Sequence, residues 1–316
     1  MFLSLAFIYI EGGGRPQDVS FSTGHVIIIS APCGVKLDIE NRPEIRIIHK
    51  APKGNQVPGG LSAMTTVITG SASGLGAAVK SRLEKAGERV IGIDLRDADI
   101  IADLSTPEGR DAAIVGVKQF CSDRLDHFVA AAGVAPDAHN TSLVISVNYF
   151  GVIELLDGLF ELLQHGHNPS AVVVSSNSAQ MGDFDNDPCV LALLDHDETN
   201  ARKLASELDA FSSGYGRSKN AVARAVRHRA ADWGRAGVRL NAIAPGSTKT
   251  PMLKRILEDP IGDLVKQIPT PLGRYAEADE IAAVVDFLLS EQASYVHGSV
   301  YYVDGGQDAQ IRPHRF

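Results

Sequence analysis

The stretch Thr65–Gly76 reads TTVITGSASGLG, and it decides the fold class. Its first five residues are β-branched, which is typical of a buried strand, and a glycine-rich turn follows at once. Leu75, Val79 and Leu83 then recur at helical spacing, so the pattern predicts a helix over Gly74–Ala86. A strand, a tight turn and a helix in this order form the first half of a β-α-β unit.

The same alternation continues to the end of the chain. Further strands are expected over Arg89–Asp94, Leu125–Ala131, Ala171–Ser175, Val238–Ala242 and Val300–Val303, and further helices over Pro107–Phe120, Leu143–Leu163, Tyr215–Trp233 and Glu277–Leu289. Strands that alternate with helices form parallel sheets covered on both faces. Residues 64–316 are therefore predicted to form a single α/β domain with a doubly wound, Rossmann-like parallel sheet.

The first 63 residues read differently from the rest. They contain 8 glycines and 5 prolines, and no helical period survives between these breakers. Met1–Ile10 is apolar but has only half of the ~20 residues that a membrane-spanning helix needs. Val26–Ile29 is a strand candidate without an evident partner. Residues 1–63 are predicted to be a disordered or weakly structured N-terminal extension, with a targeting segment as the alternative.

Composition and charge exclude several classes of protein. The chain has 316 residues and a net charge of −8, whereas nucleic-acid binding usually needs a basic surface. Cys33, Cys121 and Cys189 lie far apart, and no CxxC or Cys/His cluster exists. The sequence therefore predicts no metal site, no disulfide framework, no nucleic-acid or membrane partner, and a reducing cytoplasmic location.

The glycine-rich turn points to a dinucleotide. Gly70, Gly74 and Gly76 allow a tight turn and a close approach of the backbone to a pyrophosphate at the start of the helix. The glycines are spaced as TGxxxGxG rather than GxGxxG. The prediction of a dinucleotide site therefore rests on the position of the turn between a strand and a helix. Asp94 ends the second strand, where a carboxylate can bind ribose hydroxyls and repel a 2′-phosphate. This favours NAD, although Arg96 leaves a phosphate-tolerant alternative open.

Several polar residues follow later strands or share a helix face. Tyr215 and Lys219 are four residues apart, so they are neighbours on one helical face, where an ammonium can lower the pKa of a phenol. Ser176 follows the predicted strand Ala171–Ser175 at the edge where such sheets bind ligands, and Ser175 is the alternative at that edge. Asn148 is a polar residue in an otherwise apolar helix, and it is either functional or a core amide that kinks the helix.

Together these features resemble the classical short-chain dehydrogenases/reductases. TGSASGLG, Asp94, Asp103-Leu104, VNYFG, VVVSS, YGRSK, LNAIAPG and YVDGG occur in the order and spacing of that family, from Met64 to about Arg312. GIDLRDADIIADLS, AGVRLN and SYVHG resemble most the bacterial 3α-hydroxysteroid dehydrogenase/carbonyl reductase group.

The resemblance implies roles for individual residues. Tyr215 would be the general acid/base, Ser176 would position the substrate oxygen, Lys219 would bind the nicotinamide ribose and depress the phenol pKa, and Asn148 would hold a water in a proton relay. The cofactor site would comprise Gly70, Ser73, Gly74, Leu75, Gly76, Asp94, Asp103, Leu104, Gly133, Tyr215, Lys219, Thr248 and Thr250. In one departure, the usual Asn-Asn-Ala-Gly reads Ala-Ala-Ala-Gly at residues 130–133, which removes amides that normally brace the sheet.

The resemblance also implies an activity. The expectation is an NAD-dependent oxidoreductase that interconverts a secondary alcohol and a ketone, with steroids or other bulky hydrophobic alcohols and carbonyls as substrates. Two alternatives stay open. One is an aryl-allylic, coniferyl-type alcohol dehydrogenase, and the other is a non-catalytic dinucleotide-sensing protein, although such a protein would be expected to lose Tyr215, Lys219 or Ser176.

An insertion separates Ser176 from Tyr215. Residues 177–214, called the insertion below, replace a connection of about a dozen residues in the resembled family. The insertion carries a net charge of −6 out of −9 for residues 64–316. Val190–Leu194 and Ala201–Leu208 have helical spacing, so one or two short helices are expected over the start of the Tyr215 helix. There the insertion would obstruct the family's tetramer contact, leave a homodimer joined through Glu277–Leu289 and the last strand, and also shape the substrate pocket. The alternative is a solvated surface excursion with no effect on assembly.

Overall fold

The computed structural model describes residues 46–47, 64–136, 140–208, 214–259 and 262–315. Within these ranges an eight-stranded sheet has the order β1-β4-β3-β2-β5-β6-β7-β10. The strands are β1 (Arg46–Ile47), β2 (Thr65–Thr69), β3 (Arg89–Asp94), β4 (Ile100–Ile101), β5 (His127–Ala130), β6 (Ser170–Val174), β7 (Arg239–Pro245) and β10 (Val300–Val303). Seven strands run parallel, and β1 pairs with β4 in the antiparallel sense.

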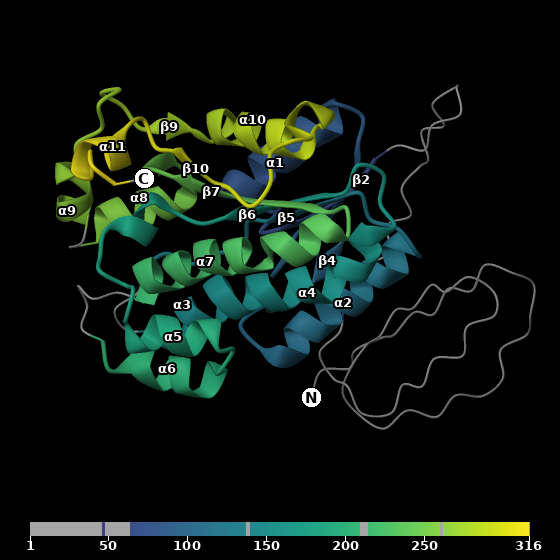
Figure 1. Cartoon of the computed structure of the whole chain (residues 1–316), viewed down its shortest axis with the longest axis horizontal. Coiled ribbons are helices and arrows are strands. Elements are labelled where there is room, and N and C mark those ends of the chain that lie inside the picture. The colour runs from purple at the N-terminus through teal and green to yellow at the C-terminus, as the bar shows by residue number, and fades with distance from the viewer. Residues whose placement is uncertain (1–45, 48–63, 137–139, 209–213, 260–261, 316) are drawn as a thin grey trace, which may run out of the picture.

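Helices cover both faces of this sheet, as predicted (Figure 1). On one face lie α1 (Gly74–Lys85) and α10 (Ala278–Leu289), whose apolar sides pack on Ile68, Val129 and Val172. The other face is covered by α2 (Pro107–Cys121), α4 (Gly151–Gln164) and α7 (Gly214–Arg235), which enclose the larger core around Phe128. The doubly wound sheet follows from strands that are apolar on both sides.

The predicted helix over Leu143–Leu163 is one continuous helical segment with an irregular turn inside it. It consists of α3 (Thr141–Ile145), a π-helical turn over Ser146–Phe150, and α4. The segment Thr141–Gln164 is long and apolar enough to cross a membrane, but 72% of its most apolar window is buried inside the domain. It is a core helix of this domain.

The insertion forms the two short helices that its spacing predicts. They are α5 (Pro188–Leu194) and α6 (Glu198–Ser206), which pack on each other and on α3 and α7 (Figure 1). Asp187 and Asp197 cap their first turns by accepting hydrogen bonds from backbone N–H groups, as Asp favours at helix starts. The insertion therefore has a packed body over the start of α7, where the sequence predicts it.

Several small elements have no clear sequence signal. They are β4, the parallel pair β8 (Thr248–Lys249) and β9 (Ala276–Glu277), and the helices α8 (Pro251–Glu258), α9 (Gly262–Gln267) and α11 (Gln307–Ile311). Strand β1 is the described part of the N-terminal extension. The prediction for the other residues of 1–63, including the strand candidate Val26–Ile29, lies outside the described residues and stays a prediction.

Candidate active site

The predicted site residues gather at one edge of the sheet, where the parallel strands end. Gly70 follows β2, Asp94 ends β3, Gly133 follows β5, and Ser176 follows β6. Thr248 comes three residues after the end of β7. Ligands bind at the carboxyl edge of such sheets, because the loops that follow neighbouring strands meet there.

The glycine-rich turn is tied to the neighbouring strand β3. The Gly70 N–H donates to the Ile93 carbonyl over 2.8 Å, and a Cβ on Gly76 would collide with the Gly70 carbonyl oxygen. Gly74, at a φ of +58°, begins α1 in the left-handed region that favours glycine. The turn is thus built from close backbone contacts that side chains would prevent.

The start of α1 has the features of an anion site. Ser73 precedes the helix but makes no capping hydrogen bond, and no acidic residue occupies the first turn. The first N–H groups of a helix need partners from outside it, and the helix dipole favours a negative one. These residues fit a pyrophosphate at the start of α1.

Asp94 occupies the position expected of a ribose ligand. Its carboxylate accepts hydrogen bonds from the N–H groups of Ala72 (3.0 Å) and Leu95 (2.7 Å), and the side chain is partly exposed. These two contacts orient the carboxylate and leave lone pairs on both oxygens for hydroxyl donors. Asp103 is exposed and accepts from the Ser105 N–H over 2.9 Å, while Leu104 next to it is buried.

The segment after β5 is tied to the sheet through its backbone. The N–H of Ala132 donates to the Thr69 hydroxyl over 3.0 Å, which ties the segment to the end of β2. A Cβ on Gly133 would lie 3.1 Å from Oδ1 of Asn148 and 3.6 Å from Nζ of Lys219. The structure therefore brings Gly133, Asn148 and Lys219 together despite the departure at residues 130–132.

Asn148 is buried inside the π-helical turn. Its Oδ1 accepts from the Val134 N–H over 2.8 Å, and its Nδ2 donates to the Val134 carbonyl over 3.1 Å. Both ends of the amide are therefore engaged by one residue, which locks the orientation of the side chain. Its position beside Gly133 and Lys219 agrees with a functional residue, and the predicted relay water stays a prediction.

Tyr215, Ser176 and Lys219 form the centre of the site. Tyr215 and Lys219 lie on α7, with Nζ of Lys219 located 5.8 Å from the centroid of the phenol ring. The phenol hydroxyl shares a hydrogen bond with the Ser176 side chain. Nζ of Lys219 donates to the Val174 carbonyl at the end of β6 over 2.8 Å. Ser175 instead donates to the Lys219 carbonyl over 2.8 Å, so Ser176 is the serine that faces the phenol.

Known proteins with a related sequence share this arrangement of strands and helices. Residues 64–187 match the family described as short chain dehydrogenase, and residues 199–308 match the family described as enoyl-(acyl carrier protein) reductase. The 3-alpha-hydroxysteroid dehydrogenase/carbonyl reductase of Comamonas testosteroni is 48% identical over 253 residues, which are 79% of this chain and 98% of that protein. The chain belongs to the short-chain dehydrogenase family, and it is an oxidoreductase of that family.

A solved structure and a second relative are also similar to this chain. The crystal structure of the 3-alpha-hydroxysteroid dehydrogenase from Pseudomonas sp. B-0831 complexed with NADH superposes with a TM-score of 0.78 at 47% identity. That match covers 80% of this chain and 100% of the other. The coniferyl-alcohol dehydrogenase of Pseudomonas sp. (strain HR199 / DSM 7063) is 31% identical over 255 residues, covering 76% of this chain and 94% of that one.

Burial shifts the pKa values of both Tyr215 and Lys219 in this short-chain dehydrogenase. Burial raises the pKa of Tyr215, and the hydrogen bond with Ser176 opposes that rise. Burial also lowers the pKa of Lys219 to about 8. Burial thus has the largest effect on both groups, and the predicted depression of the phenol pKa by Lys219 stays a prediction.

The two threonines that the resemblance assigns to the cofactor site follow strand β7. Thr248 is buried and donates to the Gly246 carbonyl over 3.0 Å. Thr250 precedes α8 and caps it by accepting from the Leu253 N–H over 3.3 Å, and its Cγ2 lies 3.7 Å from where a Cβ on Gly74 would be. The start of α8 therefore lies against the glycine-rich turn, as the resemblance implies for this part of the site.

Some residues that support the site could not be found in the sequence. The Ser178 hydroxyl donates to Oγ of Ser176 over 3.0 Å. Next to Ser176, the Asn177 amide donates to Oε1 of Gln307 over 2.8 Å, and Gln307 in turn donates to the Thr270 hydroxyl over 2.8 Å. Asn177, Gln307 and Thr270 are far apart in the chain, and no local pattern marks their contacts.

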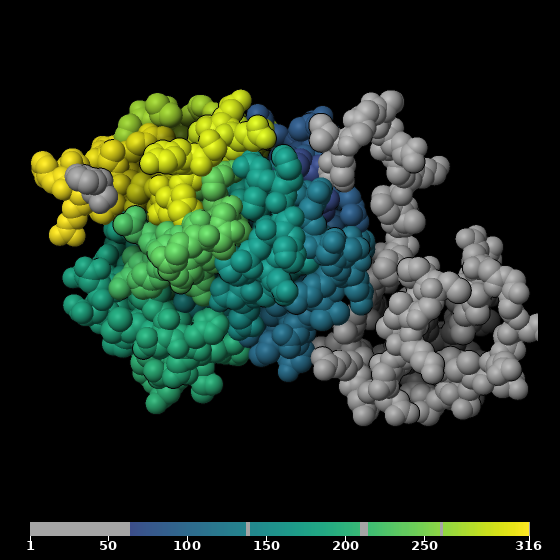
Figure 2. All heavy atoms as spheres, turned by 45° about the vertical axis from the view of Figure 1, so that its right-hand side comes forward, coloured from purple at the N-terminus to yellow at the C-terminus, as the bar shows by residue number. Residues whose placement is uncertain are grey.

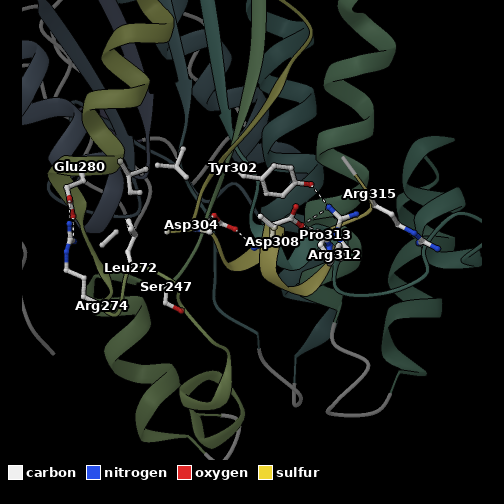
Figure 3. Close-up of a pocket in the computed structure, with 16 residues that line it drawn as sticks. Ser247, Leu272, Arg274, Glu280, Tyr302, Asp304, Asp308, Arg312, Pro313 and Arg315 are labelled. Carbon is white, nitrogen blue, oxygen red and sulfur yellow. Dashed lines mark hydrogen bonds and ion pairs between the residues drawn. The ribbon is translucent and has the colours of Figure 1, made fainter.

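A cavity of about 680 Å³ lies beside the site, between the start of α10, the end of β10 and α11 (Figure 3). Its charged lining residues are largely paired, Arg274 with Glu280 (2.7 Å) and Arg312 with Asp308 (2.6 Å). None of the predicted catalytic residues lines it. Among the described residues, no group of three or more His, Cys, Asp and Glu side chains is arranged to hold a metal ion.

Proposed function

We propose that this chain is an NAD-dependent dehydrogenase that interconverts a secondary alcohol and a ketone. Steroids and other bulky hydrophobic alcohols and carbonyls are the proposed substrates. The observation that carries the proposal is the contact of the Tyr215 phenol with Ser176 beside the buried ammonium of Lys219. All three groups lie at the strand edge that also holds the uncapped start of α1. A purely dinucleotide-sensing protein would have no use for this cluster.

Two residues of the chain would act on the substrate oxygen, each in a different role. Ser176 holds that oxygen by a hydrogen bond, and Tyr215 takes the proton from an alcohol or returns it to a ketone. Lys219 keeps its ammonium against the Val174 carbonyl, close enough to the phenol to stabilise the charge that develops there. NAD, when bound, supplies the hydride acceptor or donor. Gly70, Gly74 and Gly76 would hold its pyrophosphate and Asp94 its adenosine ribose.

A panel of alcohols tests this activity. With NAD present, we expect the chain to reduce the cofactor with 3α-hydroxysteroids and with bulky secondary alcohols, monitored as NADH absorbance. Coniferyl alcohol tests the alternative, and its preference over every steroid would replace the proposed substrate class. Failure of all secondary alcohols and of the corresponding ketones with NADH would contradict the proposed function.

The choice between NAD and NADP should depend on Asp94. Its carboxylate would repel a 2′-phosphate, so we expect a higher kcat/KM with NAD than with NADP. Asp94→Ser removes the charge and should lower this preference by about tenfold or more, which corresponds to ~1.4 kcal/mol. The matched control is Asp97→Ser, three residues further on and outside the site. Equal kcat/KM for both cofactors in the unchanged chain would show that Asp94 does not decide the preference.

We also propose that the chain is a homodimer, located in the cytoplasm. The insertion covers the starts of α3 and α7, where Thr141 donates to the Ala205 carbonyl over 2.7 Å and Arg217 pairs with Asp187 over 2.8 Å. Figure 2 shows the green surface of α7 bordered by teal surface of neighbouring segments. A second copy approaching this face would meet the bulk and the −6 charge of the same insertion on its partner.

Light scattering on the purified protein measures the assembly. We expect the mass of a dimer, close to twice 33.6 kDa, because the face formed by α10 and β10 remains available. Substitution of Phe287, an exposed residue of α10, by Glu should shift the dimer toward the monomer. A tetramer built on the α4 and α7 faces would contradict the proposal.

A further inference from the structure

A buried arginine lies where the insertion meets the domain. Arg110, in the first turn of α2, has only 1% of its surface exposed, although a guanidinium is a charged group in proteins. Its Nε donates to Glu154 of α4 over 2.6 Å, and its Nη2 donates to Glu198 of α6 over 2.5 Å. A buried guanidinium needs such partners, because an unpaired charge in the protein interior is strongly destabilising.

Glu198 also contacts the π-helical turn. While its Oε2 accepts from Arg110, its Oε1 accepts from the Ser146 hydroxyl over 2.9 Å. Ser146 is buried and is the first residue of the turn that contains Asn148. The guanidinium therefore orients a carboxylate from the insertion, and that carboxylate in turn holds the start of the turn.

The same arginine touches two other parts of the site. Its Nη1 donates to the Leu104 carbonyl over 3.4 Å, and its Cζ lies 5.8 Å from the centroid of the Phe150 ring at the other end of the π-helical turn. The turn is therefore held at both ends by one group of charges. A π-helical turn is rare and depends on its surroundings, so the loss of such a contact should let it relax.

We propose that Glu198 is a positioning residue, which acts through Ser146 to hold the turn that places Asn148 beside Gly133 and Lys219. The insertion thereby organises the active site in addition to covering α7. Glu198 belongs to residues 188–198, the stretch between the two segments that match the family descriptions. The catalytic readout rests on the proposed function, whereas the backbone readout described below does not.

Ser146→Ala is the sharpest variant, because it removes one hydrogen bond and leaves the ion pairs of Arg110 in place. Its matched control is Ser142→Ala, since the Ser142 hydroxyl also donates to α6, to the Arg202 carbonyl over 3.3 Å, but lies outside the turn. We expect Ser146→Ala to lower kcat by about tenfold with KM for NAD within about twofold, because misplacing a catalytic group lowers the rate more than binding. Ser142→Ala should change neither.

The pair Glu198→Gln and Glu198→Ala separates the hydrogen bond from mere packing. Glutamine keeps one oxygen that can accept from Ser146 but presents its NH2 group to Arg110, so its kcat should fall less than that of the alanine variant, which should lose about tenfold or more. Hydrogen–deuterium exchange on the full chain supplies a readout without turnover. Ser146→Ala and Glu198→Ala should speed exchange over residues 143–151, and Ser142→Ala should not.

The outcomes are separable. An unchanged kcat and unchanged exchange in Ser146→Ala, or equal losses for Glu198→Gln and Glu198→Ala, would overturn the positioning role. So would faster exchange spread evenly over the whole domain, since that would mean general destabilisation. If the unchanged chain oxidises no alcohol, the proposed function fails, and the exchange over residues 143–151 alone decides the role of Glu198.

Discussion

Tyr215→Phe should lower kcat by roughly 10²–10⁴-fold while leaving the affinity for NAD nearly unchanged. The substitution keeps the ring near Lys219 and removes only the hydroxyl, and a positioned acid/base group typically contributes a factor of this size. Single-turnover formation of NADH measures the chemical step, and NADH fluorescence measures cofactor binding. Because burial raises the pKa of the phenol, alcohol oxidation should speed up as the pH rises, and ketone reduction should slow down.

A second tyrosine offers a control for this variant. Burial also raises the pKa of Tyr302, and its hydroxyl interacts with Arg312 over 3.4 Å, but it lies outside the catalytic cluster. Tyr302→Phe should therefore keep kcat within about threefold. Near wild-type turnover in Tyr215→Phe would remove Tyr215 from the proposed mechanism, whatever the control does.

Lys219→Met should abolish most activity and at the same time change how stability depends on pH. Burial lowers the folded-state pKa of Lys219 from 10.5 to about 8. The unfolded chain then binds more protons than the folded chain between about pH 8 and 10.5, so wild-type stability relative to the variant rises with pH across that window. At ~1.4 kcal/mol per pKa unit, this shift of the Lys219 pKa changes the free energy of unfolding by about 3 kcal/mol across that window.

Urea unfolding at pH 7 and at pH 10.5 measures this effect. At pH 7 the wild-type chain bears the cost of the buried ammonium, which the variant lacks, although the variant also leaves the Val174 carbonyl without its donor. The difference in free energy of unfolding, wild type minus variant, should therefore become more positive at pH 10.5. Lys85→Met, at the exposed end of α1, is the control. A difference that does not change with pH would show that Lys219 is not desolvated.

The active site illustrates how chemistry can be predicted from residues that lie near each other in the chain. Tyr215 and Lys219 are one helical turn apart, so any helix places them on one face. Gly70, Gly74 and Gly76 mark the turn because their backbone geometry requires small residues. The insertion's two helices were likewise predicted from local spacing, since α5 and α6 each have an apolar side that packs on the domain.

Other features of the site depend on partners that no local pattern identifies. Ser175 and Ser176 are equivalent in the sequence, and only the packing of β6 against α7 turns Ser175 toward the Lys219 backbone and Ser176 toward the phenol. Asn148 likewise reads as either a core amide or a functional group. The structure places it against Val134 and beside Lys219.

The sequence by itself determined the α/β class, the order of the main strands and helices, the glycine-rich turn and the Tyr215–Lys219 pair, because each rests on a periodicity or a spacing within one element. Only the tertiary structure decided the raised pKa of Tyr215 and the contact from Arg110 through Glu198 to Ser146. Desolvation depends on everything packed around a group, and Arg110 and Glu198 meet across 88 residues of chain.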